Sequence, residues 1–461
     1  MRPMKKTHKE SGKQPLYQTV YLYFRQQIES GFLAVGNKLP SIRQMTRDSG
    51  VSRTTVETAY EQLCADGYVI CRPQSGYYVS DLHIQSKPIQ TGGAAQEITD
   101  KEFEYDFSGK RMDSREFDFQ IWRKLAKNVM QDSEPFMAYG FPQGEPKLRE
   151  QIAKYLSAGR GVYASSEQII IGAGVQSLLH LFCAMTENAQ TKVAFETPGF
   201  PKGYQIFQDH KVPATFVPGD GQGIDIRRLY ESGANVLYVS PSHTFPTGAT
   251  MPHQKRQEIL RWSADTDGLI IEDDYDGELK YSGKPLATLT SLDRWGHVFY
   301  LGTFSKLLPP SLRISYLILP EAYVETYQKI AANYNQTSST MEQLTMASYI
   351  ENGFLEKQIR RLRRIYGRKN AEVTRAFAKY FGDMATVYPN DTGLHVTVSL
   401  QTALSAGEIC EKAEKRGIGL TPMANQQEGE HARIYMSCAS IREEKIEEAI
   451  GILRELMKEG E

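Results

Sequence analysis

The sequence predicts a multidomain protein, in which a small N-terminal α+β domain precedes a large C-terminal α/β domain. Helical periodicity and then two short β-rich runs occupy the first 80 residues. From about residue 105 onward, short apolar runs typical of buried strands alternate with helical patterns. The chain of 461 residues also has the length of about three domain-sized units.

The composition is that of a soluble globular protein. Hydrophobic residues make up 40% of the chain and charged residues 24%, which is typical of a protein with a sizeable core. No apolar run reaches the ~18 residues that a membrane helix needs, and the N-terminus lacks the apolar core of a signal peptide. The five cysteines are scattered and never spaced as Cys-x-x-Cys, which argues against a disulfide framework and a zinc site. We therefore expect a cytoplasmic protein with no membrane segment and no bound metal.

Charge is distributed unevenly along the chain. Residues 1–80 contain eleven Lys or Arg and six Asp or Glu, a net charge of +5, so that residues 81–461 carry −6 of the total of −1. A basic first domain favours a polyanionic partner for that domain alone. On charge alone, a locally basic surface explains the pattern equally well.

The first 80 residues predict three short helices. Apolar residues recur every four positions over 16–28 and predict the first helix. Ser41, with Gln44 three residues later, predicts the start of a second helix through a capping box. Ser52 predicts the N-cap of a third helix, whose buried stripe begins at Val56.

Two β-rich runs, 68–71 and 77–79, follow the helices and predict a hairpin with a basic tip. Three helices, with a four-residue turn between the second and third, and then a hairpin form the plan of a winged helix-turn-helix. Donors and short hydroxyls at the start of the third helix suit base edges and phosphates. An ordinary polar helix face, or a helix-turn-helix that contacts only proteins, is the alternative. The candidate DNA-binding residues are Arg43, Ser52, Arg53, Thr54, Thr55 and Arg72.

Several short motifs in this segment resemble the DNA-binding domain of the GntR family. They are Leu39–Gln44, Ser49–Val56, Ala59–Leu63, Gly67-Tyr68 and Gly76-Tyr77. The resemblance implies that the domain of residues 1–80 binds double-stranded operator DNA.

Residues 81–104 show no sustained periodicity and contain Lys87-Pro88 and the small-residue run Thr91–Ala95. They predict an extended linker between the domain of residues 1–80 and a body of residues 105–461. At roughly 24 residues the segment is longer than an ordinary loop between elements. A signal from a ligand to DNA would have to cross it.

Apolar runs in the large body predict a parallel sheet that is covered on both faces. The runs are 168–171, 192–195, 235–239, 268–271 and 297–301. Ligands of such sheets bind at the carboxyl ends of the strands. The residues that follow each run are therefore the candidates for a site.

Side chains suited to a phosphorylated aromatic ligand follow several of these runs. A glycine turn after the first run offers the N–H groups of Val175 and Gln176 to a phosphate. Phe200, after the second run, is able to lie flat against a ring. After the fourth run, Asp273 suits a protonated pyridine nitrogen and Tyr275 a phenolic oxygen. Each residue also has an ordinary structural interpretation, as core or as a solvated turn.

Lys306 follows the fifth run, with Thr303 and Ser305 beside it and Arg313 seven residues later. An amine near hydroxyls and a guanidinium suits a carbonyl compound that carries a phosphate. The lysine condenses to a Schiff base, while the arginine and hydroxyls hold the phosphate. Most loop lysines are simply solvated, but features of this kind after all five runs, with His243 after the third, favour a site.

Together these features resemble the fold-type I aminotransferases that use pyridoxal 5′-phosphate (PLP), over about residues 105–461. With the GntR-like domain, the whole chain resembles MocR-type regulators, the class that includes the GABA-responsive regulators. The resemblance implies PLP as cofactor, Lys306 as the internal-aldimine lysine, and a phosphate site made by Arg313, Thr303, Ser305, Val175 and Gln176. It also implies that Asp273 pairs with the pyridinium nitrogen, Tyr275 with the ring hydroxyl, and that Phe200 stacks on the ring.

The resemblance extends to two further segments. Ala432–Ser437 is similar to the strand whose arginine, here Arg433, grips a substrate carboxylate. Tyr139–Gly144 is similar to the segment whose tyrosine, here Tyr139, reaches the phosphate of the partner subunit. A homodimer with shared sites is implied.

Some positions depart from the family pattern. Phe245 stands before Pro-Thr-Gly where aminotransferases carry Asn, so His243 is our substitute for the ring-hydroxyl contact. Family spacing favours Glu272 as the pyridinium partner, but Asp273 shares a strand face with Tyr275. We therefore expect Asp273 to fill this role.

The effector is expected to differ from that of the GABA-responsive regulators. Lys202 stands where those members have an arginine, and no histidine lies near Arg115-Glu116 where they have one. Lys202 and Arg433 are the candidate effector-binding residues.

Three functions fit the sequence. The leading one is a transcription factor that senses an amino acid or amine when the compound replaces Lys306 and forms an external aldimine. The second is an active PLP-dependent aminotransferase with an accessory DNA-binding domain. The third is a sensor of PLP that regulates vitamin B6 synthesis, which the cofactor-binding residues cannot distinguish from the first.

Overall fold

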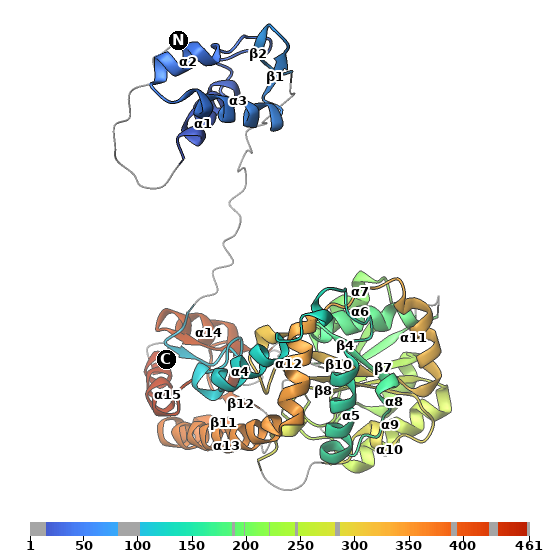
Figure 1. Cartoon of the computed structure of the whole chain (residues 1–461). Coiled ribbons are helices and arrows are strands. Elements are labelled where there is room, and N and C mark those ends of the chain that lie inside the picture. Colours follow the sequence, from blue (N-terminus) through green and yellow to red (C-terminus); the bar gives the residue numbers. More distant parts are fainter. Residues whose placement is uncertain are drawn as a thin grey trace. The chain divides into compact units, whose positions relative to one another are not determined.

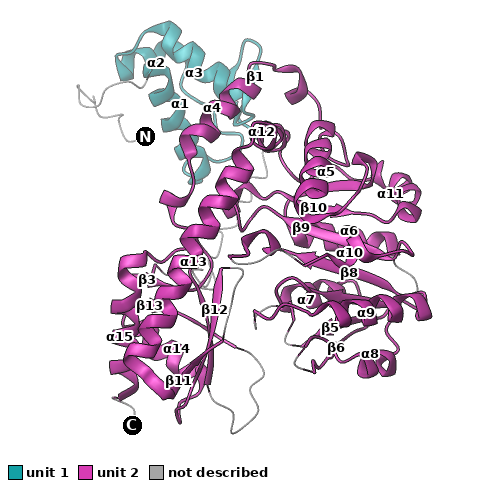
Figure 2. Cartoon of the chain, turned by 90° about the horizontal axis from the view of Figure 1, so that it is seen from below, with its two compact units in different colours: residues 1–100 teal, residues 101–461 magenta. Residues whose placement is uncertain are grey.

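The chain, for which a computed structural model was obtained, divides into two compact units, residues 1–100 and 101–461 (Figure 2). The structure describes residues 15–81, 102–186, 190–197, 199–220, 222–244, 248–281, 286–388, 394–423 and 432–458. Residues 82–101, most of the predicted linker, lie outside the described residues. The predicted domain limits at residues 80 and 105 stay predictions.

In the first unit, described over residues 15–81, three helices and a hairpin are present, as predicted. Its elements are α1 (Leu16–Glu29), α2 (Ile42–Ser49), α3 (Arg53–Ala65), β1 (Val69–Arg72) and β2 (Gly76–Val79). The hydroxyl of Ser41 accepts the N–H of Gln44, and that of Ser52 accepts the N–H of Thr55, so both predicted caps are present. Val20, Phe24, Val56 and Tyr60 meet in the core, whereas Leu16, at the start of the apolar stripe, is exposed.

The second unit is built on a seven-stranded sheet of order β4-β10-β9-β8-β7-β5-β6 (Figure 1). Its strands are β4 (Ile169–Gly172), β5 (Val193–Glu196), β6 (Ala214–Val217), β7 (Val236–Val239), β8 (Leu269–Asp274), β9 (Val298–Thr303) and β10 (Ser315–Ile318). All five predicted strands are present. These five strands run parallel to one another, as predicted, whereas β10, which was not predicted, runs antiparallel to both β4 and β9.

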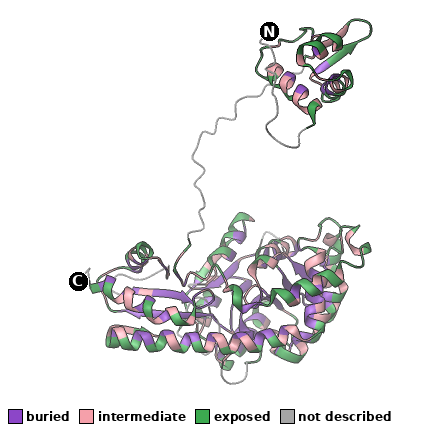
Figure 3. Ribbon diagram, turned by 60° about the vertical axis from the view of Figure 1, so that its left-hand side comes forward, coloured by how far each residue is buried: buried purple, intermediate pink, exposed green. Residues whose placement is uncertain are grey.

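Helices cover both faces of this sheet. They are α4 (Phe119–Val129), α5 (Pro146–Arg160), α6 (Val175–Thr186), α7 (Pro201–Asp209), α8 (Ile226–Ser232), α9 (His253–Thr266), α10 (Leu289–Leu292), α11 (Val324–Ala331) and α12 (Thr340–Glu351). Successive strand residues point to opposite faces. Phe195 packs into a core with α6, α7 and α11, and Ala194 into another with α8, α9 and α10. Most of the sheet is accordingly buried (Figure 3), whereas the edge strand β6 is partly exposed.

A smaller antiparallel sheet of order β11-β12-β15-β14 forms the C-terminal part of the unit. Its strands and flanking elements are β11 (Ala385–Val387), β12 (His395–Leu400), β13 (Ile418–Gly419), β14 (Thr421–Pro422), β15 (Ala432–Ser437), α13 (Phe354–Phe381), α14 (Ala406–Lys415) and α15 (Glu443–Lys458). β3 (Tyr105–Asp106) pairs with β13, so residues 105 and 106 belong to this part. No helix among the described residues is long and apolar enough to cross a membrane.

Single-turn 3₁₀ helices connect these elements. They are η1 (Ser114–Glu116), η2 (Glu134–Phe136), η3 (Ser166–Gln168), η4 (Gly277–Leu279), η5 (Pro310–Leu312), η6 (Glu321–Tyr323) and η7 (Gly382–Met384).

Candidate functional site

A cavity of about 310 Å³ lies at the carboxyl ends of β7, β8 and β9, beside the start of α6. Ten of the residues predicted for cofactor or effector line it, from segments far apart in the sequence. These are Val175, Gln176, Phe200, Lys202, Asp273, Tyr275, Thr303, Ser305, Lys306 and Arg313. Gly174, Ser240, His395 and Tyr435 complete the lining.

Lys306 is half-buried in the loop that follows β9. Burial lowers the pKa of its amine, as does Lys202, whereas Asp276 and Asp273 raise it. A lowered pKa increases the fraction of neutral amine, which is the nucleophilic form. The site therefore holds a lysine suited to attack a carbonyl carbon.

One end of the cavity is rich in hydrogen-bond donors. Arg313 adopts a left-handed conformation, and its Nη2 donates to the carbonyl of Ala173 over 3.0 Å. A Cβ on Gly174 would lie 2.7 Å from Cζ of Arg313, so only glycine leaves room for this guanidinium. The first N–H groups of α6, at Val175 and Gln176, have no acceptor within their own helix. This end suits a phosphate.

Thr303 and Ser305 lie at the same end. The hydroxyl of Ser315 donates to Oγ1 of Thr303 over 2.7 Å, and the N–H of Ser305 lies 3.2 Å from the same oxygen. Oγ1 of Thr303 in turn donates to Oγ of Ser305 over 3.2 Å. Ser315, on the unpredicted strand β10, thus orients the hydroxyl of Thr303 without lining the cavity.

A carboxylate stands at the other end. Oδ2 of Asp273 accepts the hydroxyl of Tyr238, while its Oδ1 is buried and has no partner among the described residues. Burial raises the pKa of Asp273 to about 7, helped by Asp274 and Asp276 and opposed by Tyr238. The ring of Phe200 stacks on that of Tyr238, with centroids 5.9 Å apart. A cationic N–H that reached Oδ1 would satisfy it and stabilise its ionised form.

Glu272 faces away from the cavity. Its carboxylate accepts the N–H groups of Leu289 and Thr290 at the start of α10, over 2.7 and 2.8 Å. Because strand residues alternate, Asp273 points to the opposite side, where Tyr275 also lies. The geometry thus favours Asp273 over Glu272, as the shared-face reasoning expects.

His243 does not line the cavity. Its Nδ1 lies 2.7 Å from Oδ2 of Asp276, and its carbonyl accepts the hydroxyl of Tyr275 over 2.9 Å. His243, which we predicted to contact the ring hydroxyl of the cofactor, therefore lies behind Tyr275. Asp276, which sequence reasoning missed, holds it there.

The C-terminal sheet supplies a wall that sequence reasoning also missed. His395 on β12 and Tyr435 on β15 stack with ring centroids 4.4 Å apart and line the cavity. Burial lowers the pKa of His395 well below its ordinary value, and Lys306 and His243 lower it further, so the imidazole is neutral. Only the two-residue alternation along the C-terminal strand could have drawn attention to Tyr435.

Two further residues predicted for cofactor or effector, Arg433 and Tyr139, also lie away from the cavity. Arg433 shares the β15 face of Tyr435, two positions along, and its Cζ lies 6.0 Å from the ring centroid of Tyr388. Tyr139 is 88% exposed, outside the cavity of its own chain. Its predicted contact with a partner subunit stays a prediction.

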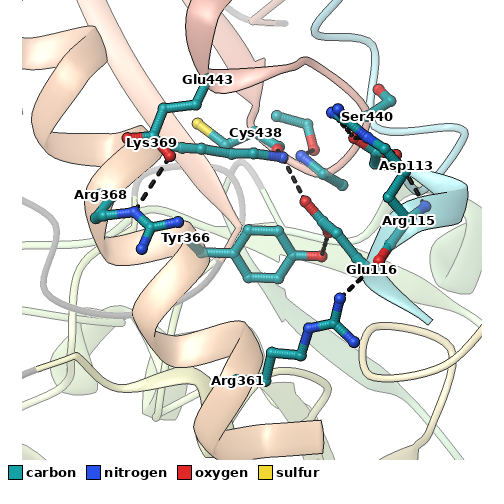
Figure 4. A network of polar contacts seen from close by, with 12 residues as sticks. Asp113, Arg115, Glu116, Arg361, Tyr366, Arg368, Lys369, Cys438, Ser440 and Glu443 are labelled. Carbon is teal, nitrogen blue, oxygen red and sulfur yellow. Dashed lines mark hydrogen bonds and ion pairs between the residues drawn. The ribbon is translucent and has the colours of Figure 1, made fainter. Parts of the chain in front are cut away.

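A buried polar network joins Glu116, at the end of η1, to side chains of α13 (Figure 4). Glu116 forms a buried ion pair with Lys369 and accepts the hydroxyl of Tyr366 over 2.7 Å. Nε2 of Gln358, on α13, donates to the carbonyls of Glu116 and Leu307, and Leu307 follows Lys306 directly. These hydrogen bonds hold the loop that carries Lys306 against α13.

The predicted DNA-binding residues lie on α2, on the hairpin and around the start of α3. Arg53 is exposed and pairs with Glu57 over 2.8 Å. Ser52 has its hydroxyl within 3 Å of those of Thr54 and Thr55, so it organises the first turn of α3. Two further candidates are exposed, Arg43 on α2 and Arg72 on β1, whose Cζ lies 4.7 Å from the ring centroid of Tyr78.

Comparison with known proteins gives two family matches and several full-length relatives. Residues 110–453 match the aminotransferase class I and II family, and residues 16–79 match the bacterial regulatory proteins of the gntR family. The uncharacterized HTH-type transcriptional regulator YdeL of Bacillus subtilis (strain 168) is 37% identical, covering 96% of this chain and 97% of that protein. The probable rhizopine catabolism regulatory protein MocR of Rhizobium meliloti is 27% identical, covering 89% and 87%.

A third relative and a solved structure complete the comparison. The HTH-type pyridoxine biosynthesis transcriptional regulator PdxR of Corynebacterium glutamicum is 30% identical, covering 87% of this chain and 86% of that protein. The crystal structure of Pyrococcus horikoshii kynurenine aminotransferase in complex with PMP matches with a TM-score of 0.70 and 25% identity, over 78% of this chain and 92% of that chain.

Proposed function

We propose a regulatory function, because the chain belongs to the aminotransferase class I and II family and joins that domain to a gntR-family domain, as MocR-type regulators do. The protein is a transcriptional regulator that binds operator DNA and PLP and responds to an amino-compound effector. One observation carries the proposal. A half-buried lysine, a donor-rich end and a carboxylate oxygen without a partner among the described residues meet in one cavity of a chain with a winged helix-turn-helix. As a DNA-binding regulator, the protein acts in the cytoplasm.

The cavity fits PLP at three points. Arg313, Thr303 and the start of α6 offer cationic and N–H donors for the phosphate. Oδ1 of Asp273, which has no partner among the described residues, offers an acceptor for the pyridinium N–H. When bound, the cofactor supplies an aldehyde carbon that condenses with primary amines, and Lys306 is the amine that this chain offers.

The effector is a compound with an amino group, which competes with Lys306 for that carbon. The lowered pKa of Lys306 would support exchange, because the lysine would leave as a neutral amine that takes up the proton lost by the attacking amino group. Among the described residues that line the cavity, Lys202 is the cationic side chain that remains besides Lys306 and Arg313, so it binds an acidic group of the effector. Arg433 supplies a second such contact if β15 shifts.

A homodimer is part of the proposal. Met137, Tyr139 and Phe141 form an exposed apolar run before α5, although large apolar side chains are ordinarily buried. Burial of this run against a second copy would cover it and bring Tyr139 to a neighbouring cavity. The sedimentation behaviour of wild type and Tyr139→Asp tests this, since a charge there opposes association.

The absorbance of the reconstituted protein tests the cofactor claim. Wild type should show the visible band of a lysine-linked pyridoxal, and Lys306→Ala should lack it while retaining the fold. A reconstituted wild type without the band contradicts the proposal. Titration of amino acids and amines, one at a time, should then shift the band for the effector.

Experiments distinguish two alternative functions from the proposed one. Sustained amino transfer to a keto acid at ordinary enzymatic rates would favour an aminotransferase. The similarity to PdxR, named as a pyridoxine biosynthesis regulator, favours a sensor of PLP itself as the second candidate. In that case operator affinity would change on adding PLP alone and would not change further with any amine.

A further inference from the structure

The two strands that carry the wall of the cavity also hold the segment through which the chain enters the large unit. His395 begins β12 and pairs in register with Ser437 at the end of β15, two residues beyond Tyr435. Residues 105–109, here called the entry segment, lie against these strand ends. By sequence, the entry segment follows the residues that connect to the DNA-binding domain.

Backbone hydrogen bonds fix the entry segment to these strands. The N–H of Ser437 donates to the carbonyl of Phe107 over 2.8 Å, and the N–H of Phe107 donates to the carbonyl of Gly419 over 2.9 Å. The hydroxyl of Ser440 donates to the carbonyl of Asp106 over 2.8 Å. Phe107 itself is fully buried in the core of the C-terminal sheet. The entry segment therefore moves with β15.

Close packing leaves little room between the entry segment and the wall. Gly109 adopts a φ of +75°, and a Cβ there would lie 3.0 Å from Cβ of Ser437 and 3.8 Å from Nε2 of His395. The backbone of residue 109 thus lies directly behind the imidazole that faces the cavity. A displacement of His395 by an effector has to be accommodated by this backbone.

The ring pair lies between the cavity and the loop that follows β7. The imidazole of His395 stacks on Tyr435 on one side, and its centroid lies 6.4 Å from that of His243 on the other. His395 and Tyr435 are both buried, with 3% and 6% of their surfaces exposed. Burial lowers the pKa of His395, so its ring packs against an effector or hydrogen-bonds to it as a neutral group.

We propose that the His395–Tyr435 ring pair is the wall that senses the effector, and that the entry segment transmits the displacement of this wall toward the DNA-binding domain. The inference rests on the proposed function and adds its regulation. A coupling between two sites of this kind changes affinity by about 5- to 150-fold. An equal change is expected for the effector when operator DNA is bound, because coupling of binding free energies is reciprocal.

Gly109→Ala in the full-length, PLP-loaded protein tests the transmission. The common amino acids and short ω-amino acids, added singly, are scored by the absorbance band and by operator affinity. The variant should still bind the active amine, as the absorbance band reports, while the change in operator affinity falls to less than about one third of the wild-type change. Gly161→Ala is the matched control, since Gly161 has a φ of +66° but a Cβ added there would meet no atom of the described residues within 4 Å.

Two further measurements keep the inference testable if Gly109→Ala folds poorly. In wild type, amide hydrogen exchange at Ser437 and Phe107 should change when the active amine is added, and unchanged exchange would overturn the transmission. His395→Asn should shift the half-maximal amine concentration by on the order of tenfold, and by more than it shifts PLP affinity. Equal shifts in the half-maximal amine concentration and in PLP affinity would overturn the proposal that His395 senses the effector.

The outcomes separate the inference from the proposed function. A wild-type protein whose operator affinity responds to no amine contradicts the proposed function, and the inference falls with it. A normal wild-type response that persists in Gly109→Ala contradicts the inference alone.

Discussion

Replacing Gly174 by alanine should weaken the binding of PLP through its phosphate. Gly174 has a φ of +97°, and an added Cβ would lie 2.7 Å from Cζ of Arg313. Because the glycine belongs to the turn before α6, the guanidinium is the group that has to move. Arg313 would then leave the donor-rich end of the cavity.

The expected loss follows from the contact that is removed. A hydrogen bond to a charged group contributes about 1.5–3 kcal/mol, which corresponds to about 10- to 150-fold in the dissociation constant of PLP. Pyridoxal lacks the phosphate, so its dissociation constant should change by less than about threefold. Both constants are measured by titrating the cofactor-free protein and following the absorbance of the bound form.

A comparison of the two ligands decides the result. Equal losses for PLP and pyridoxal would refute the assignment of Arg313 to the phosphate, as would an unchanged PLP affinity. Gly161→Ala again serves as the control, because it introduces backbone strain at a positive φ in open space. It should lower stability by about 1–2 kcal/mol without changing either affinity.

Three further changes have defined outcomes. Arg53→Ala should weaken operator binding by about 1–3 kcal/mol in a gel-shift titration while leaving PLP binding intact, and an unchanged operator affinity would refute docking through α3. Lys369→Met leaves Glu116 buried without its cation, so the free energy of unfolding in urea should fall by about 3–5 kcal/mol, and a loss below about 1 kcal/mol would refute the role of the pair. The carboxyl of Asp273 has a folded pKa of about 7 against an ordinary 3.8. As the pH rises, the unfolded chain therefore releases the Asp273 proton at a lower pH than the folded chain does. The free energy of unfolding of the cofactor-free protein should fall by up to about 4 kcal/mol between about pH 4 and pH 7, relative to that of Asp273→Asn. Parallel pH profiles of the two proteins would contradict the buried, protonated carboxyl.

Features that depend on local pattern were predictable from the sequence. The loop that carries Lys306 and Arg313 follows the continuous apolar run of β9. The caps at Ser41 and Ser52 need only a side chain and an N–H three residues on. The carboxyl ends of parallel strands then bring residues such as Val175 to one place. No long-range contact has to be known for this step.

Features that depend on which segments meet were not predictable. The strand β10 follows a short loop after β9 and returns antiparallel, a direction that its four buried residues do not encode. His395 and Tyr435 reach the cavity only because the C-terminal sheet folds back onto the large sheet. In the sequence, neither residue has a neighbour with related chemistry.

The choice between Asp273 and Glu272 depends on both the local strand pattern and the tertiary contacts. Strand periodicity alone separates Asp273 from Glu272, because successive residues face opposite sides of β8. It does not say which side holds the cavity, and the tertiary partners decide this. Glu272 meets the free N–H groups that begin α10, whereas Asp273 meets the hydroxyl of Tyr238 from the next strand. The first carboxylate is fully satisfied by the protein, and the second keeps a buried oxygen without a partner among the described residues. Of two adjacent acids, the one that the fold leaves incomplete is therefore the one available to a ligand.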